Sequence, residues 1–293
     1  MISIKHALPL VTMVILCWSS AQAAPPATWS QSYGAEMVWY SYAAYCPQSQ
    51  IQSWSCTWCK KVGAFTTSEV FVNKSADSLA FVGFSTSSQQ IMVVFRGTSN
   101  IQNWLADADF VQTPYPAFPN AMVHKGFNDV YNGLKIGIID ELKTLVSKYG
   151  SFPIIVSGHS LGGALATLCT ADIARNAASY FGSGAHQIYQ WDFGRPRVGN
   201  KAFATGFQGL KIPTWRHVNQ KDIVPHVPPE ALNYYHTTQE VWEHANCQFQ
   251  QCSSTNGEDP NCSDSLSDPD SVSDHLNYFE YLYVFFLCTS FSP

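Results

Sequence analysis

The chain has 293 residues, of which 46% are hydrophobic and only 13% charged. This apolar content excludes a disordered chain or a solvated coiled coil, because both classes are far richer in charged residues. Sixteen Lys and Arg stand against 21 Asp and Glu, for a formal charge of −5. That balance argues against a protein that binds nucleic acid through its phosphates.

The beginning of the sequence is typical of a secretory signal peptide. Lys5 precedes an apolar run over residues 7–17, and Ala21-Gln22-Ala23 forms a small-x-small cleavage site. The apolar run is much shorter than the roughly twenty residues that a membrane-spanning helix needs. We therefore expect residues 1–23 to be a signal peptide, the mature chain 24–293 to be secreted, and no transmembrane anchor.

Hydrophobic patterns predict helices and strands in alternation along the mature chain. Strands are expected at 90–95, 152–156, 187–193, 214–218 and 234–242, and helices at 29–45, 127–148 and 161–178. This order is typical of one α/β domain, in which helices cover a mostly parallel central sheet.

The cysteines indicate disulfide bonds. Removal of the signal peptide leaves eight cysteines, an even number in an oxidising compartment. Cys56 and Cys59 would close a small loop, whereas Cys169 lies inside a predicted helix and is a candidate buried free thiol. A zinc site that combined this pair with the later cysteines would fit a cytosolic protein better, so we expect no metal.

The last part of the chain is acidic. From Asp222 onward there are eleven acidic residues and no Lys or Arg. Within it, residues 247–273, here called the acidic loop, are rich in Ser, Asn, Asp and Gly, which predicts a solvated loop clamped by cysteines. Sequons at Asn73 and Asn261 predict a glycoprotein where the host glycosylates.

The segment Gly158-His159-Ser160-Leu161-Gly162 matches the G-x-S-x-G motif. It lies between a predicted strand and a predicted helix, as a nucleophile elbow requires. A serine hydroxyl is a weak nucleophile, and it therefore needs a histidine base and a carboxylate that orients the base.

Asp222 is the best candidate for the carboxylate, because it follows a predicted strand at the carboxyl edge of the sheet. The histidines that follow it are His226, His236, His244 and His275. His226 is only four residues from Asp222 and is expected to be structural, and His236 lies in the predicted strand 234–242. Spacing alone leaves the choice open, with His275 as the leading candidate.

Seven motifs in this order closely resemble those of the fungal-type class 3 lipases. They are Phe95-Arg96-Gly97-Thr98, Ile101-Gln102-Asn103-Trp104, His124-Lys125-Gly126-Phe127, residues 158–164, residues 193–199, Asp222-Ile223-Val224-Pro225 and Asp274-His275. The resemblance covers about residues 29–288. It implies an α/β-hydrolase fold without a cofactor, with Ser160 as nucleophile, Asp222 as orienting acid and His275 as base.

The resemblance implies further site residues. Thr98 and Leu161 would donate to the oxyanion, which agrees with the position of Leu161 directly after the nucleophile at a helix N-terminus. Similar enzymes also join an early cysteine to one near the carboxyl end, which implies a Cys46–Cys288 disulfide. The pairing of Cys247, Cys252 and Cys262 stays open.

Residues 99–110 lie where similar lipases carry a short helix, or lid, over the site. Ile101, Trp104 and Leu105 fall at i, i+3 and i+4, so this segment would be amphipathic as a helix. We assign these three residues and Val224 to the lid and the substrate-binding surface. The alternative is that Trp104 packs against the core as a fixed cap.

The resemblance implies a monomeric triacylglycerol lipase that acts on acylglycerols at a lipid–water interface, without nucleic acid as a partner. A feruloyl esterase is the alternative, because such enzymes resemble this family and would place a phenolic acid where an acyl chain lies. An apolar lid favours the lipase. A binding protein that had lost the chemistry is disfavoured, because Thr98 and all three triad residues are present.

Overall fold

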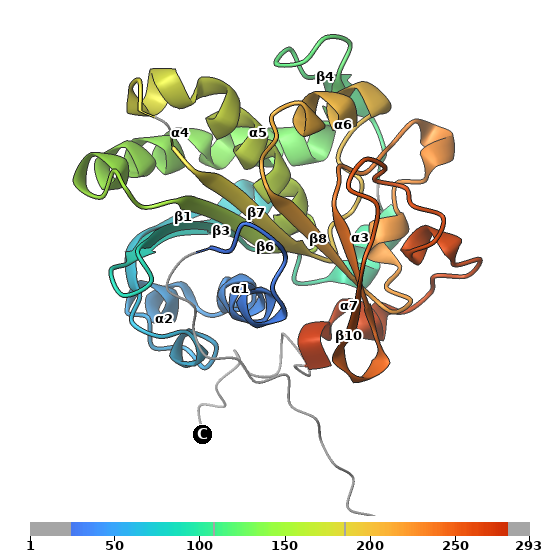
Figure 1. The fold of residues 1–293 in the computed structure, drawn as a ribbon, viewed down its shortest axis with the longest axis horizontal. Helices are drawn as coiled ribbons and strands as arrows, with labels where there is room; N and C mark the ends of the chain where they lie inside the picture. The colour runs from blue at the N-terminus through green and yellow to red at the C-terminus, as the bar shows by residue number, and fades with distance from the viewer. Residues whose placement is uncertain (1–24, 108, 185, 281–293) are drawn as a thin grey trace, which may run out of the picture.

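An eight-stranded sheet forms the centre of the molecule (Figure 1). The computed structural model describes residues 25–280 apart from 108 and 185. The strand order is β1-β2-β3-β6-β7-β8-β9-β10. The strands are β1 (Thr66–Asn73), β2 (Ser78–Ser85), β3 (Gln90–Phe95), β6 (Ile154–His159), β7 (Ile188–Phe193), β8 (Thr214–Asn219), β9 (Glu240–His244) and β10 (Gln248–Gln251). The strands from β3 to β9 are parallel, whereas β1, β2 and β10 pair antiparallel at the edges.

Helices cover both faces of the sheet. Figure 1 shows α1 (Gln31–Ala43) and α2 (Gln48–Gln52) on one face, and α4 (Lys125–Lys148), α5 (Leu161–Phe181) and α6 (Lys201–Gln208) on the other. The short helices α3 (Ile101–Asp107) and α7 (Val272–His275) lie in connections, and β4 (Gln112–Pro114) pairs with β5 (Met122–His124) in a separate small sheet.

This architecture follows from the burial of the central strands on both sides. Every residue of β3 and β6 is buried, and the apolar side chains divide between a core under α1 and a second core under α4 and α5. The apolar stripe of α4 contributes Leu134, Ile138, Leu142 and Leu145 to the second core. A continuous apolar run is what a strand between two helical layers requires.

Strand register brings the carboxyl ends of the parallel strands together. Phe95 of β3 pairs with Gly158 of β6, and Phe193 of β7 pairs with both His159 of β6 and His217 of β8. The chain segments that follow these strands therefore meet at one edge of the sheet. This is the edge where open α/β sheets bind their ligands.

Most of the predicted elements are confirmed, but one strand is wrong in extent. The strand predicted at 90–95 is β3, and the helix predicted from Phe127 begins at Lys125. Of the strand predicted at 234–242, only the part from Glu240 onward is β9. The preceding residues bond to loops instead, since the Tyr235 N–H donates to Gly199 O and the His236 N–H donates to Glu258. The strands β1, β2 and β10 were not predicted, and β10 lies within residues 247–273, which were expected to be a loop throughout.

The described part of the chain contains the disulfide bonds that the cysteine count predicted. Cys56 and Cys59 are joined as expected, Cys252 pairs with Cys262, and Cys169 is a buried free thiol. Cys46 and Cys247 are also disulfide-bonded. The expected partner of Cys46, Cys288, lies outside the described residues, as does the expected signal peptide.

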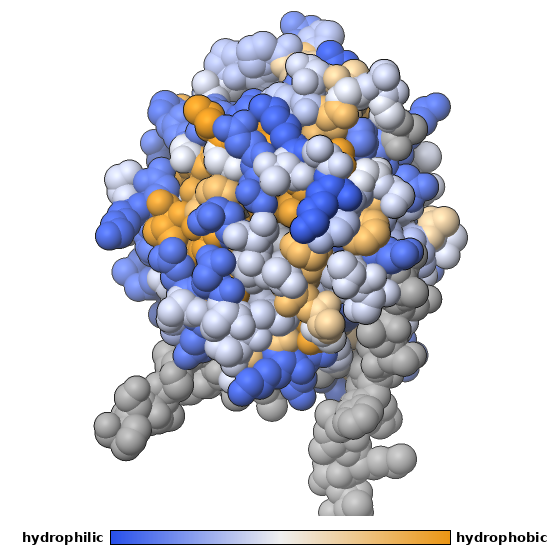
Figure 2. All heavy atoms as spheres, turned by 90° about the vertical axis from the view of Figure 1, so that its left-hand side faces the viewer, coloured by the Kyte–Doolittle hydropathy of each residue, from blue (hydrophilic) through white to orange (hydrophobic). Residues whose placement is uncertain are grey.

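The surface on the side of α4 and β1 is mostly polar. In Figure 2, which looks at the left-hand side of Figure 1, apolar side chains form small groups separated by polar ones. Within the described part of the chain, no helix is long and apolar enough to cross a membrane.

Candidate active site

Ser160 occupies a strained turn between β6 and α5. Its backbone has φ 61° and ψ −132°, a conformation that residues other than glycine rarely adopt. Gly158 makes the turn possible, because a Cβ atom there would lie 2.3 Å from the carbonyl oxygen of Gly162. The structure thus builds the nucleophile elbow that the motif predicts.

His275 and Asp222 form a buried pair at the same edge of the sheet. Asp222 follows β8, and α7 places His275 so that its Nδ1 lies 3.0 Å from Asp222 Oδ1 and 2.9 Å from Asp222 Oδ2. Both side chains are almost fully buried. Gly194, which follows β7 with φ 60°, leaves room for them, because a Cβ there would lie 2.8 Å from the His275 ring and 2.9 Å from Asp222 Oδ2.

The other imidazole nitrogen of His275 is available for chemistry. His275 Nε2 and Ser160 Oγ are both buried, and neither has a hydrogen-bond partner among the residues that the structure describes. The imidazole lies beside the elbow, because its centroid is 4.5 Å from that of His159, the residue before Ser160. Such hydrogen bonds are often long in the absence of substrate and shorten when substrate binds.

Two further groups hold the Asp222 carboxylate. The Tyr278 hydroxyl donates to Oδ2 at 2.5 Å, and the Val224 N–H donates to Oδ1 at 2.8 Å. The Val224 side chain is fully buried. Val224 thus contacts the site through its backbone N–H, and the assignment of Val224 to the substrate-binding surface stays a prediction.

A second histidine links the elbow to the His275 segment. His159 Nε2 donates to the backbone oxygen of His275 at 2.7 Å, and His159 Nδ1 accepts from the Tyr45 hydroxyl at 2.7 Å. A carbonyl oxygen can only accept, which places the imidazole proton on Nε2. Burial, and then the nearby His275, hold the pKa of His159 well below its usual value, so the ring is neutral.

The oxyanion candidates lie on either side of the elbow. Leu161 is the first residue of α5. The segment after β3 passes directly over Ser160, because a Cβ on Gly97 would lie 3.0 Å from Ser160 Cβ. Thr98 is the next residue along this segment. Backbone N–H groups at a helix N-terminus and beside the nucleophile are suited to stabilise a developing oxyanion.

The expected lid contains a helix, α3, over its residues 101–107. Ile101 is buried, Leu105 is half-buried, and the half-buried Trp104 ring stacks on Phe127 of α4 with 6.2 Å between centroids. Phe127 stacks in turn on His124. A cavity of about 580 Å³ opens between α3 and the start of α4. Its lining includes Thr98, Asn100, Asn103, Trp104, Asp109, Val111 and His124.

The remaining candidate histidines have other partners. His236 Nε2 donates to Pro225 O, and His244 Nε2 bonds with Gln250. Burial and then the charge of Arg197 lower the pKa of His226 to about 4, and its Nε2 has no hydrogen-bond partner in the described structure. Only His275 of the four histidines makes a hydrogen bond to Asp222 among the described residues.

Two groups of acidic or sulfur side chains in the described residues are close enough together to hold a metal ion. The first combines Glu240 with Cys252 and Cys262. These sulfurs are joined in a disulfide, which has no thiolate to offer a metal. The second is Glu230, Glu258 and Asp264. In this group Glu258 is paired with the Arg197 guanidinium at 2.8 Å, and Asp264 lies 3.7 Å from the same group, so a positive charge already occupies one side of the cluster.

Sequence reasoning missed several residues that shape this site. Gly194 lies within a motif noted above and Tyr278 lies three residues after another, whereas Tyr45 belongs to none of them; no local pattern indicated the contacts of these three residues. His159 stood inside the G-x-S-x-G motif as its variable position. Its link to His275 depends on two segments that are 116 residues apart in the chain.

Comparisons with known proteins agree with this geometry. The profile of the lipase (class 3) family matches residues 92–232. The lipase of Rhizomucor miehei is 36% identical over 78% of this chain and 62% of its own length, and the lipase of Rhizopus niveus is 31% identical over 78% and 57%. The chain thus spans about three fifths of these relatives. A solved triacylglycerol lipase whose catalytic centre is a serine protease triad is 33% identical, with a TM-score of 0.80 over 90% of this chain and 99% of its own.

Proposed function

The chain belongs to the class 3 lipase family, and from this we propose that it is a secreted serine esterase that hydrolyses the ester bonds of acylglycerols. The observation that carries the proposal is the buried His275–Asp222 pair beside the Ser160 elbow. The proposed mechanism needs no metal and no cofactor. Relatives described as secreted acylglycerol lipases support both the substrate class and the localisation.

In the first half of the proposed reaction, Ser160 Oγ attacks the ester carbonyl carbon while its proton passes to His275 Nε2. Asp222 stabilises the imidazolium that forms and keeps the Nδ1 proton directed at its carboxylate. The N–H groups of Thr98 and Leu161 receive the oxyanion. The tetrahedral intermediate then collapses, and the glycerol oxygen leaves with the proton from Nε2.

In the second half, water attacks the acyl group on Ser160. His275 Nε2 takes a proton from this water and returns one to Ser160 Oγ when the second tetrahedral intermediate collapses. The products are a fatty acid and an enzyme with its triad restored. The elbow, the base and the acid all lie on the ends of rigid elements, so they keep their geometry through both halves.

We further propose that α3 is a lid that opens at a lipid surface. Closed, it keeps Ile101 buried and Trp104 against Phe127. Moving side chains of this size from water into lipid is worth roughly 1.5–3 kcal/mol each, which is enough to shift a closed-to-open balance of a few kcal/mol. Val111, next to the lid, is 48% exposed and extends the apolar surface that an interface would cover.

The test is an assay of the purified chain on tributyrin, a long-chain triglyceride, a phospholipid and methyl ferulate. We expect hydrolysis of tributyrin to rise abruptly when the substrate exceeds its solubility, and to be faster than that of methyl ferulate. A smooth saturation curve, with methyl ferulate as the faster substrate, would instead establish a feruloyl esterase.

A further inference from the structure

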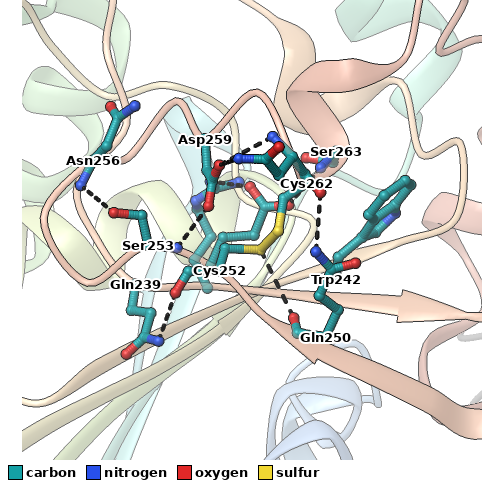
Figure 3. The surroundings of a disulfide bond; sticks show 12 residues. Gln239, Trp242, Gln250, Cys252, Ser253, Asn256, Asp259, Cys262 and Ser263 are labelled. Atoms are coloured by element: carbon teal, nitrogen blue, oxygen red, sulfur yellow. Dashed lines mark hydrogen bonds and ion pairs between the residues drawn. A yellow bond between two sulfur atoms is a disulfide. The ribbon is translucent and has the colours of Figure 1, made fainter.

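The acidic loop is held together by a disulfide and a central carboxylate. Cys252 and Cys262 join its two sides, and the Asp259 carboxylate accepts from the N–H groups of Ser253 at 2.8 Å and Asn261 at 3.0 Å (Figure 3). The side chain of Gln239, the residue before β9, donates a hydrogen bond from Nε2 to Cys252 O and so attaches the loop to the end of the sheet. The loop is therefore an ordered unit, and the Cys252–Cys262 disulfide agrees with the cysteine clamp that the sequence predicted.

Glu258 of this loop points away from solvent onto a buried arginine. The Arg197 guanidinium donates Nε to Glu258 Oε1 and Nη2 to Glu258 Oε2, both at 2.8 Å. The side chains are 5% and 10% exposed, respectively. A bidentate pair in a dry environment fixes both orientation and distance. Glu258 Oε1 also accepts from the His236 N–H at 2.6 Å.

Both partners of Glu258 hold the same short segment, residues 224–228. Arg197 Nη1 donates to His226 O at 2.9 Å, and the Arg197 N–H donates to Val227 O at 2.9 Å. His236 Nε2 donates to Pro225 O at 2.7 Å. The Glu258 carboxylate is thus connected to residues 224–228 twice, once through Arg197 and once through His236.

That segment begins two residues after Asp222 and helps to orient it. The Val224 N–H donates to Asp222 Oδ1, the oxygen that also lies 3.0 Å from His275 Nδ1. A displacement of residues 224–228 would therefore move a donor of the carboxylate that holds the proposed base. Small displacements of such groups lower the rate of reaction, because catalysis depends on their alignment to within about 1 Å.

We propose that Glu258 is a positioning residue for Asp222, through which the disulfide-bonded acidic loop sets the geometry of the catalytic acid. The inference rests on the function proposed above. Its physical basis is that Glu258 provides the main opposite charge for Arg197. The nearest other carboxylate, Asp264, is 3.7 Å from Arg197 Nη2. A neutral residue at 258 would leave the guanidinium to seek new partners, and its hydrogen bonds to His226 O and Pro228 O would loosen.

The test compares Glu258→Gln with Asp259→Asn in the full chain. Asp259→Asn alters the neighbouring carboxylate of the same loop, which contacts the N–H groups of Ser253 and Asn261. Hydrolysis of dissolved 4-nitrophenyl butyrate is measured well below each melting temperature. We expect Glu258→Gln to lower kcat about tenfold with little change in KM, as the loss of roughly one hydrogen bond to a charged group would. It should also move the acid limb of the kcat/KM profile to lower pH. Asp259→Asn leaves the Arg197–Glu258 pair in place, so it should lower the melting temperature with a clearly smaller loss of kcat.

Unchanged kcat and pH profile in Glu258→Gln, or an equal loss of kcat in both variants, would overturn the proposal. Arg197→Lys keeps the buried charge but loses the bidentate geometry. This variant replaces Glu258→Gln in the test if Glu258→Gln does not fold. Normal kcat in Arg197→Lys would then count against the positioning role.

A readout without substrate separates this inference from the proposed function. The downfield proton resonance of His275 Nδ1, hydrogen-bonded to Asp222, should broaden or disappear in Glu258→Gln and persist in Asp259→Asn. Its persistence in Glu258→Gln overturns the positioning role even if the chain is an esterase. A wild-type chain that shows no Ser160-dependent hydrolysis overturns the proposed function instead.

Discussion

The Tyr278 hydroxyl donates a hydrogen bond of 2.5 Å to Asp222 Oδ2, on the carboxylate that also holds His275. Tyr278 is fully buried, and its own backbone N–H donates to the Tyr42 hydroxyl at 2.9 Å. Burial and this backbone hydrogen bond hold the Tyr278 ring in place beside the carboxylate. The donor shares the negative charge of Asp222 and limits the rotation of its side chain.

We expect Tyr278→Phe to lower kcat about tenfold, because a hydrogen bond to a charged group contributes roughly 1.5–3 kcal/mol. Tyr131→Phe is the matched control, since it removes another buried tyrosine hydroxyl from a carboxylate, that of Asp172, away from the site. Both variants should lose stability, but only Tyr278→Phe should lose kcat. Equal kcat in the two variants would contradict the assigned role.

Ser160→Ala is expected to abolish ester hydrolysis and leave the fold intact, because it removes one buried hydroxyl that makes no hydrogen bond among the described residues. A fluorophosphonate probe should label the wild type and leave the variant unlabelled.

Asp222→Asn and His275→Ala should each lower kcat by several orders of magnitude, since members of a triad act as a unit. Equal damage from His226→Ala would show that the base is assigned wrongly.

Thr98→Val tests the oxyanion site. The loss of one oxyanion donor typically costs about 10² to 10³ in turnover. If the Thr98 hydroxyl contributes, Thr98→Val should lower kcat more than it raises KM. An unchanged kcat would show that the backbone N–H is sufficient, because valine keeps that group and the shape of the side chain.

Trp104→Ala tests the lid. Removal of the indole takes away its stacking on Phe127 and an apolar surface for lipid. We expect the rise in rate at the solubility limit to be blunted more than the rate on dissolved monomer. A proportional fall of both rates would indicate that Trp104 is a fixed cap of the core.

Glu243 gives the stability a pH dependence. Burial raises the pKa of Glu243 to about 8, although the Phe279 N–H that donates to it acts in the opposite direction. The folded chain therefore keeps this carboxyl protonated over a range in which the unfolded chain ionises it. Its contribution is complete below the unfolded pKa of 4.5 and is lost as the pH rises towards 8.

Glu243→Gln should remove this dependence, because the amide keeps an acceptor for the Phe279 N–H and cannot ionise. We expect its melting temperature to exceed that of the wild type by about 2 °C or more at pH 8, and by less at pH 5. Asp140→Asn, at an exposed surface position, is the control. A constant difference between pH 5 and pH 8 would contradict the argument.

Local patterns in the sequence determined the central strands, the long helices and the elbow. The run 90–95 predicted β3 because a strand buried on both faces must be apolar throughout. Ser160 was found from its motif, since the strained turn requires glycines at set positions. Asp222 followed from its place after a strand. These features depend on residues that are close together in the chain, so local sequence patterns predict them.

Tertiary structure alone decided which histidine meets Asp222 and what holds the pair in place. Spacing made His275 the leading candidate without closing the choice among four histidines, and the resemblance to a family then implied His275. The contacts of Tyr278 with Asp222 and of Glu258 with Arg197 join residues 56 and 61 positions apart. Such contacts depend on strand register and on which edge of the sheet each loop returns to. These long-range choices leave no periodic trace in the sequence, because they are set by the packing of the whole chain.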